Sequence, residues 1–431
     1  MKSISTLALI AATGIFATAA SAADLGGNCC ADLEERIAEL EATTARKGNR
    51  KVSLTVSGHI NENIMFWDDG SERNVYAGQT NMAAQTRFRF VGNAKISEDL
   101  SAGYLLEIGT ASSRSDHVDQ NTDDFGGGLG IRHSAWWMQS KHLGKVWVGQ
   151  TSTATDGITE INLANTAHIG MQNLAANGGA MFVRNANGTS SGLRHTQFMG
   201  GAAGPSSAAV DSSQIGEGNR QNVVKYESPS LMGFSLATAY GEDDMWDIAM
   251  RYAGEHHGFK LAFGVGYQRW TDGNNDERNC APAIAGSSSD RDCQQLGLSG
   301  AVMHVATGLY VHGVYGIRWD DNAPVAQKDT TDRYYLQAGI ENKFIALGKT
   351  TLFGEYGNYN VGFNGNGTNL LTAHTQVWGI GLNQSIEAAA MDLYLNYQHF
   401  DFGGTSNLAG FGAGGGLKDY QQVIAGGIIR F

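Results

Sequence analysis

The sequence predicts an all-β fold: a 16-stranded antiparallel transmembrane β-barrel with an inward-folded third loop and a short N-terminal periplasmic coiled-coil helix. From residue 51 onward, apolar and polar side chains alternate with a period of two, as expected for strands with one face in lipid and one in water. The links between these segments are short and long in turn, which is typical of barrels with short periplasmic turns and long outer loops. All four prolines fall in predicted loops or turns, because proline has no N–H to donate to a sheet ladder.

Residues 1–22 have the pattern of an export signal. Lys2 supplies a positive charge, residues 7–20 form an apolar stretch, and Ala20-Ser21-Ala22 is a small-x-small cleavage site. The apolar stretch is too short for a transmembrane helix, which needs about 20 residues. We therefore expect a signal peptide that is cleaved after Ala22.

Residues 23–50 are expected to form a periplasmic segment with a short coiled coil. Leu33, Ile37, Leu40 and Thr44 follow one another at the spacing of a heptad seam. A helix this short is marginal by itself, so the seam predicts a bundle of identical chains and hence a homotrimer. A solvated tail helix is the alternative.

Residues 51–431 are predicted to form the barrel. In the first segment, apolar residues occupy the even positions from Val52 to Ile60 and polar or small residues occupy most of the odd ones. The link near 242–245 is short where the alternation of link lengths predicts a long one. The sixteen predicted strands lie near residues 52–66, 84–96, 101–112, 131–140, 145–151, 219–227, 232–241, 246–253, 258–270, 294–303, 308–319, 333–343, 350–360, 375–385, 391–401 and 420–431.

The period of two also assigns charged side chains to the lumen. In Arg87-Phe88-Arg89-Phe90 the phenylalanines must face lipid, because an arginine there would cost about 2–4 kcal/mol at the bilayer midplane. Arg87 and Arg89 are therefore expected to point into the lumen. The same reasoning places these further residues inside: Lys95, Glu107, Lys225, Asp247, Arg251, Lys260, His312, Arg318, Glu341, Glu355 and Asp392.

The segment 152–218 is far too long for a passive loop, and long loops are usually functional. Folded inward, it would bring Asp156 and Glu160 opposite the basic wall residues Arg87 and Arg89. Opposed charges in the narrowest part of a water-filled pore set ion selectivity. The alternative is that residues 152–218 form a surface loop.

The four cysteines form two pairs in the sequence. Cys29 and Cys30 are adjacent, whereas Cys280 and Cys293 flank a polar loop. In an oxidising periplasm, the second pair is expected to form a disulfide. Neither pair has the partner pair that a zinc finger needs, so no metal site is expected.

Other functional classes find little support in the sequence. The net charge of −12 argues against nucleic-acid binding, which needs basic patches. The stretch 188–192 matches a nucleophile-elbow pattern, but no strand is predicted before it and no helix after it. We therefore expect no enzyme and no cofactor.

Several stretches resemble the rhizobial-type outer-membrane porins of alphaproteobacteria. They are residues 29–41 running into 51–58, then 143–150, 154–163 and 427–431. The resemblance implies a trimeric barrel in the Gram-negative outer membrane, whose third loop narrows a channel for passive diffusion of ions and small hydrophilic solutes. It also implies that Asp156 and Glu160 face Arg87 and Arg89.

The closing strand ends in an aromatic residue, Phe431, which resembles the signal that the barrel-assembly machinery reads. The loop that carries Cys280 has no counterpart in the resemblance. A substrate-specific channel, for example for a sugar, remains the alternative within transport. A barrel-borne enzyme or a surface adhesin is the alternative from another class.

Overall fold

The computed structural model describes residues 51–203, 210–211, 215–242, 244–271, 292–321, 328–362 and 370–431. The predicted signal peptide, the predicted coiled coil and Cys280 lie outside these residues. Among the described residues, no helix is both long and apolar enough to cross a membrane.

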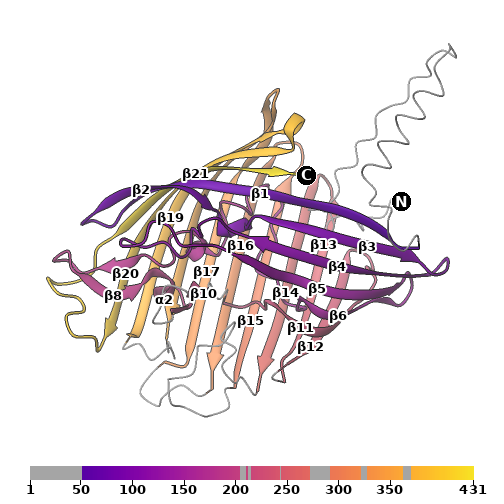
Figure 1. The fold of residues 1–431 in the computed structure, drawn as a ribbon, viewed down its shortest axis with the longest axis horizontal. Helices are drawn as coiled ribbons and strands as arrows, with labels where there is room; N and C mark the ends of the chain where they lie inside the picture. The colour runs from indigo at the N-terminus through magenta and orange to yellow at the C-terminus, as the bar shows by residue number, and fades with distance from the viewer. Residues whose placement is uncertain are drawn as a thin grey trace.

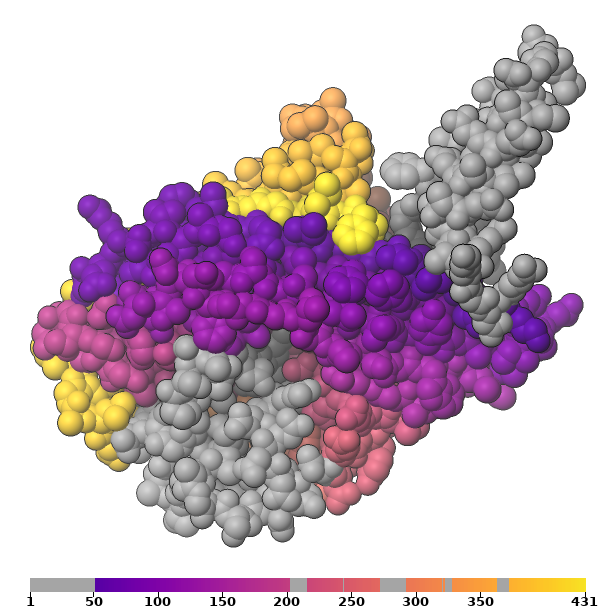
Figure 2. Space-filling model, in the orientation of Figure 1, coloured from indigo at the N-terminus to yellow at the C-terminus, as the bar shows by residue number. Residues whose placement is uncertain are grey.

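In the described part of the chain, sixteen antiparallel wall strands close into a barrel (Figure 1). The strand β1 (Ser53–Asp68) pairs with β3 (Arg87–Lys95) on one side and with β21 (Tyr420–Arg430) on the other. Figure 2 shows this seam, where yellow C-terminal residues lie against the indigo start of the barrel. The 16-stranded antiparallel barrel predicted from the sequence is thus confirmed.

Each of the sixteen predicted segments overlaps one wall strand. The remaining wall strands are β4 (Leu100–Thr110), β5 (Leu129–Ser140), β6 (Gly144–Ser152), β11 (Arg220–Glu227), β12 (Phe234–Gly241), β13 (Trp246–His256), β14 (Phe259–Trp270), β15 (Cys293–His304), β16 (Leu309–Asp320), β17 (Thr330–Ile345), β18 (Gly348–Val361), β19 (Leu370–Ile386) and β20 (Met391–Ser406). Neighbours in this order are hydrogen-bonded throughout, with β6 paired to β11 across the long segment 153–219.

The predicted strands near 52–66 and 84–96 leave residues 67–83 as one of the long links, and this prediction of a loop was wrong. A further strand, β2 (Arg73–Thr80), turns back after β1 and pairs with its upper half, Glu62–Asp68. Residues 81–86 then leave the ladder before β3 begins. Most positions of β2 carry polar residues or glycine, so the alternation that marks the other strands is missing there.

The two faces of the wall have opposite character. On β17, Leu336 is 51% exposed and its neighbour Gln337 is fully buried. On β20, Leu393 is exposed and Asp392 is buried. Exposed apolar and buried polar side chains are the reverse of a soluble protein, and they identify an outer face made for lipid. We call the opposite face the inner face.

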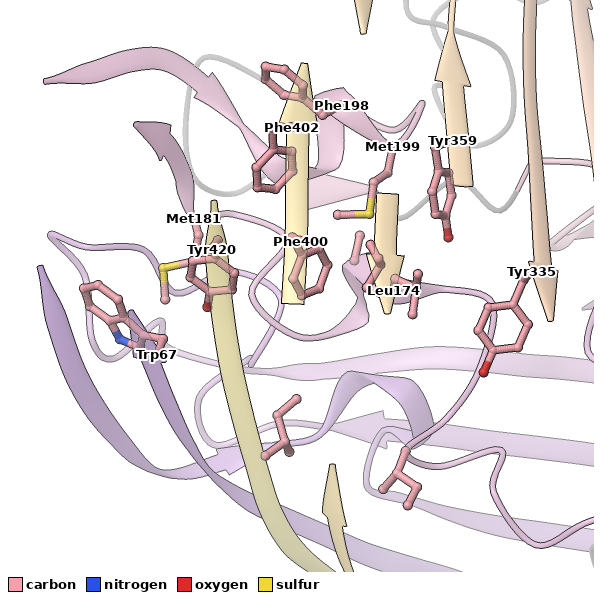
Figure 3. Packing of buried hydrophobic residues seen from close by; sticks show 14 of the residues in the cluster. Trp67, Leu174, Met181, Phe198, Met199, Tyr335, Tyr359, Phe400, Phe402 and Tyr420 are labelled. Carbon is pink, nitrogen blue, oxygen red and sulfur yellow. The ribbon is translucent and has the colours of Figure 1, made fainter. Parts of the chain in front are cut away.

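Segment 153–219 packs against the inner face of the strands from β16 to β21. It contains η2 (Leu174–Ala176), the hairpin of β7 (Phe182–Arg184) and β8 (Ser190–Arg194), α2 (His195–Phe198), and the short pair β9 (Ala202–Ala203) and β10 (Val210–Asp211). Leu174, Met181, Phe198 and Met199 of this segment lie among aromatic side chains of the wall (Figure 3). The aromatic residues of the wall in this cluster are Trp67, Tyr310, Tyr335, Phe353, Tyr359, Tyr394, Phe400, Phe402 and Tyr420.

Candidate functional site

A cavity of about 1070 Å³ lies between the inner face, the segment 81–86 and the first part of segment 153–219. Five arginines and five carboxylates line it, together with polar and small residues. The charged lining residues are Arg87, Arg114, Arg132, Arg220, Arg430, Asp116, Asp156, Glu160, Glu387 and Asp392. The structure thus brings three of the four predicted constriction residues, Arg87, Asp156 and Glu160, to one cavity.

On the basic side of the cavity, three arginine side chains surround one buried carboxylate. Glu107 on β4 is fully buried and stands directly opposite Arg89 of β3 in the ladder. Nε of Arg89 and Nε of Arg132 each lie 2.7 Å from a Glu107 oxygen, and Nη1 of Arg87 lies 3.5 Å from one. Three guanidinium groups around one carboxylate leave this wall with an excess of positive charge. Arg89, the fourth predicted residue, lies in this cluster but outside the lining of the cavity.

Arg132 was missed because a β-bulge reverses its direction. Trp136 and Met138 of β5 are exposed on the outer face, so simple alternation would put position 132 on the same face. The ladder instead pairs Glu107 with His133 and Ile108 with Ile131, which leaves Arg132 as an extra residue. Bulges re-aim side chains in this way, and a single sequence carries no clear signal for them.

The acidic side of the cavity comes from a tight turn at the start of segment 153–219. The amide of Ile158 donates to the carbonyl of Thr155 at 2.9 Å, and Gly157 has a φ of +73° that favours glycine. Asp156 directly precedes that glycine, and Glu160 follows it three residues later. Arg220, a second arginine that alternation did not find, lies with Nη1 3.8 Å from Oδ2 of Asp156.

Comparison with known families decides the identity. Residues 6–416, nearly the whole chain, match the family model described as Gram-negative porin. The chain belongs to the Gram-negative porin family. It is therefore an outer-membrane channel for passive diffusion.

Solved structures agree with this fold at low sequence identity. The anion-selective porin from Comamonas acidovorans is 17% identical with a TM-score of 0.56, and the match covers 88% of this chain and all of that one. OmpF of Salmonella typhi, solved with daunomycin, is 13% identical with a TM-score of 0.53 over 88% of this chain and 98% of that one. The trimer form of OmpT from Vibrio cholerae is 13% identical with a TM-score of 0.51 over 88% and 99%. Comparison with the curated proteins gives no significant match.

In this porin, four of the other charged residues predicted to face the lumen bind segment 153–219 and lie outside the cavity lining: Asp247, Arg251, Arg318 and Glu341. Fully buried Asp247 accepts hydrogen bonds from the amides of Ala154 and Thr155, at 3.1 and 2.7 Å, and from the Thr155 hydroxyl at 2.7 Å. Arg251 donates to the carbonyls of Ala154 and Asp156 at 2.9 Å each. Both wall residues therefore position the turn that carries the acids.

Further along the segment, the inner face provides more anchors. Arg318 donates to the Gly200 carbonyl at 3.0 Å, and Glu341 accepts from the Asn165 amide at 2.8 Å. Asn165 also donates to Asp392, which lines the cavity.

The remaining predicted lumen residues have other surroundings. Glu355 is buried and accepts from the Tyr335 hydroxyl at 2.7 Å. Lys225 is 2.9 Å from Glu227 in an ion pair. Lys260 is partly buried on β14, His312 is buried on β16, and Lys95 is exposed at the end of β3.

The end of the segment is joined to its beginning through a buried acid. Oε2 of Glu217 accepts from the amide of Thr159 at 2.9 Å and from its hydroxyl at 2.6 Å. Arg333 of the wall donates to the same hydroxyl at 2.8 Å. Burial and the nearby Glu160 carboxylate raise the pKa of Glu217 well above its usual value.

Proposed function

We propose that segment 153–219 narrows the channel and that the charged groups around the cavity form its constriction. The observation that supports this best is the meeting of opposite charges: Asp156 and Glu160 of the segment line the same cavity as Arg87 and Arg132 of the wall. Opposed charges in a water-filled passage bias the permeation of ions. The channel then conducts ions and small hydrophilic solutes by passive diffusion.

The lining favours a general pore over a sugar-specific channel. None of the described residues that line the cavity is Phe, Tyr or Trp, whereas ten are Asp, Glu or Arg. An aromatic track on which sugar rings could stack is therefore missing from this part of the passage. Charge and size, rather than stacking, should discriminate among solutes here.

Assembly and export complete the proposal. A homotrimer is supported by the heptad seam of residues 33–44, and a structure with a similar fold is described as a trimer form. The segment 1–22 serves as a cleaved signal peptide, and the strand ending in Phe431 is presented to the barrel-assembly machinery. We also retain the rhizobial-type porins as the subgroup that the sequence resembles, and the Cys280–Cys293 disulfide as an expected feature of an outer loop.

The constriction is tested by removing its positive wall. We expect the double variant Arg87→Gln/Arg89→Gln to fold and insert, because lumen substitutions tune selectivity while charges on the lipid face govern stability. Its reversal potential in a salt gradient across a planar bilayer should shift toward cation preference, because one positive charge leaves the cavity lining and a second leaves the Glu107 cluster beside it.

The matched control is Arg73→Gln, an exposed arginine at the far end of β2 and outside the cavity lining. This variant should keep the parent potential. An unchanged potential in a correctly folded Arg87→Gln/Arg89→Gln channel would contradict the proposed constriction.

A further inference from the structure

β2 and β3 pair with the same edge of β1, one after the other, with residues 81–86 between them. β1 pairs with β2 from Glu62 onward and with β3 from His59 backward, so two residues of β1 stand opposite the six residues 81–86. An ordinary β-bulge adds one residue. The larger surplus here forms a turn that contains η1 (Met82–Ala84).

The turn 81–86 lies on the inner face, against segment 153–219. Asn81 is fully buried, and its Nδ2 donates to the His168 carbonyl and to the Tyr394 hydroxyl, both at 3.0 Å. Its Oδ1 accepts from Nδ2 of Asn177 at 3.2 Å. His168 and Asn177 belong to segment 153–219, and Tyr394 belongs to the inner face of β20. The turn is therefore tied to the same elements that narrow the channel.

Gln85, near the end of the turn, contacts three basic side chains of the cavity. Its backbone carbonyl accepts from Nε of Arg87 and is 2.9 Å from Nε2 of His59. Its side-chain Oε1 accepts from Nη1 of Arg132 at 3.0 Å. Gln85 and all three basic residues line the cavity. Glu107 holds other nitrogens of the two arginines, so each guanidinium is fixed from two sides.

A glycine leaves room for this arrangement. A Cβ atom added to Gly109 of β4 would lie 2.8 Å from Cδ of Arg132 and 2.9 Å from Oε1 of Gln85. Both distances are below normal van der Waals contact. Any larger residue at position 109 would therefore displace the Gln85–Arg132 pair.

We propose that the turn 81–86 is a second constriction element of this channel and that Gln85 is a positioning residue that sets its ion preference through Arg87 and Arg132. The inference rests on the proposed function, because it assumes that these arginines face the permeating ions. The Coulomb energy between an ion and a fixed charge falls with their separation. A guanidinium held by two acceptors presents its charge at one place, whereas a released one spreads it over many rotamers.

The test compares Gln85→Leu, Arg132→Gln and the double variant by reversal potential. Leucine keeps the bulk of the side chain and removes the Oε1 acceptor, while the backbone bond to Arg87 can remain. We expect Gln85→Leu to lower the anion-to-cation permeability ratio by roughly two-fold, the order expected when one unit charge moves by a few ångströms in water. Arg132→Gln should lower it further. The double variant should equal Arg132→Gln, because Gln85 acts through Arg132.

Non-additivity separates positioning from a general structural effect. If Gln85→Leu leaves the ratio unchanged, or if its effect adds fully to that of Arg132→Gln, Gln85 does not act through Arg132 and the inference is overturned. If Arg132→Gln alone has no effect, the inference is likewise overturned. In either case the Arg87→Gln/Arg89→Gln variant decides the proposed function separately. If its reversal potential shifts, the proposed constriction stands; if its reversal potential does not shift, the proposed constriction is overturned too.

Two further variants complete the test: an independent disturbance of the Gln85–Arg132 pair and a matched control. Gly109→Ala disturbs the same pair from the opposite side and should shift the ratio in the same direction, which keeps the test valid if Gln85→Leu does not fold. Gln376→Leu, an exposed position on the outer face of β19, is the matched control and should keep the parent ratio.

Discussion

Asp247 should decide whether the acidic turn of the constriction stays docked. The variant Asp247→Ala removes the acceptor of three hydrogen bonds from Ala154 and Thr155. A hydrogen bond to a charged group contributes about 1.5–3 kcal/mol. Water enters the vacated site of an aqueous lumen and these bonds are not additive, so we expect docking to weaken by about 3 kcal/mol in total.

A loss of that size raises the undocked population of the turn about a hundredfold, since about 1.4 kcal/mol corresponds to a factor of ten. The barrel itself should persist, because the only wall-strand amide that donates to this carboxylate among the described residues is that of Ala239, at 3.1 Å, and the backbone pairing of β12 with β13 continues on both sides of it. Single-channel recordings in planar bilayers should then show greater current noise and a higher mean conductance, as Asp156 and Glu160 leave the narrow zone.

Asp401→Ala serves as the control, because Asp401 is an exposed carboxylate near the end of β20 and outside the cavity lining. It should keep the parent conductance and noise. Channels of Asp247→Ala with parent conductance and noise would show that this carboxylate does not hold the turn, and the reasoning from its hydrogen bonds would be refuted.

Three further predictions concern the lipid-facing wall, the outer cysteine loop and the assembly. Leu336→Arg on the outer face of β17 should destabilise the barrel by about 2–4 kcal/mol in denaturant titrations in lipid, because a charge then faces hydrocarbon; a loss as small as that of Leu336→Ala would count against this assignment of faces. Mass spectrometry of non-reduced peptides should find a bridge between Cys280 and Cys293, and two free thiols would disprove it. Native mass measurement in mild detergent should give three chains per particle, and monomers alone would exclude the proposed trimer.

The wall strands were predictable because a lipid face and a water face impose alternation on every strand. β2 was not, since Asn74, Gly78 and Gln79 interrupt that pattern. Asn, Gly and similar residues are depleted in strands, so the segment reads as a loop. Its pairing with β1 is a local hairpin across residues 69–72, but the polar residues of β2 remove the alternation by which a strand is recognised.

The cavity was predictable in part. Alternation placed Arg87 on the inner face. The length of the segment after the fifth wall strand predicted an inward fold, which would bring Asp156 and Glu160 opposite the arginines. Arg132 required knowledge of a bulge, which depends on the register between β4 and β5. Asp247 was recognised as inward-facing, but its hydrogen bonds to a distant loop follow from packing that alternation cannot supply.

The seam between β1 and β21 has a consequence for the order in which the barrel assembles. His59 pairs with Arg430, and the amides of Gly58 and Phe431 donate to each other's carbonyls at 2.9 and 3.0 Å. These partners are almost as far apart in the chain as two described residues can be, and such non-local pairing is slow to form. Until β21 pairs with β1, the edge of β1 stays open, and its unpaired backbone groups can pair with a strand of another chain. Newly exported chains must therefore be kept apart until β21 pairs with β1 and the barrel closes. A delay in this step does not only slow folding, because the open edge also allows the porin to aggregate.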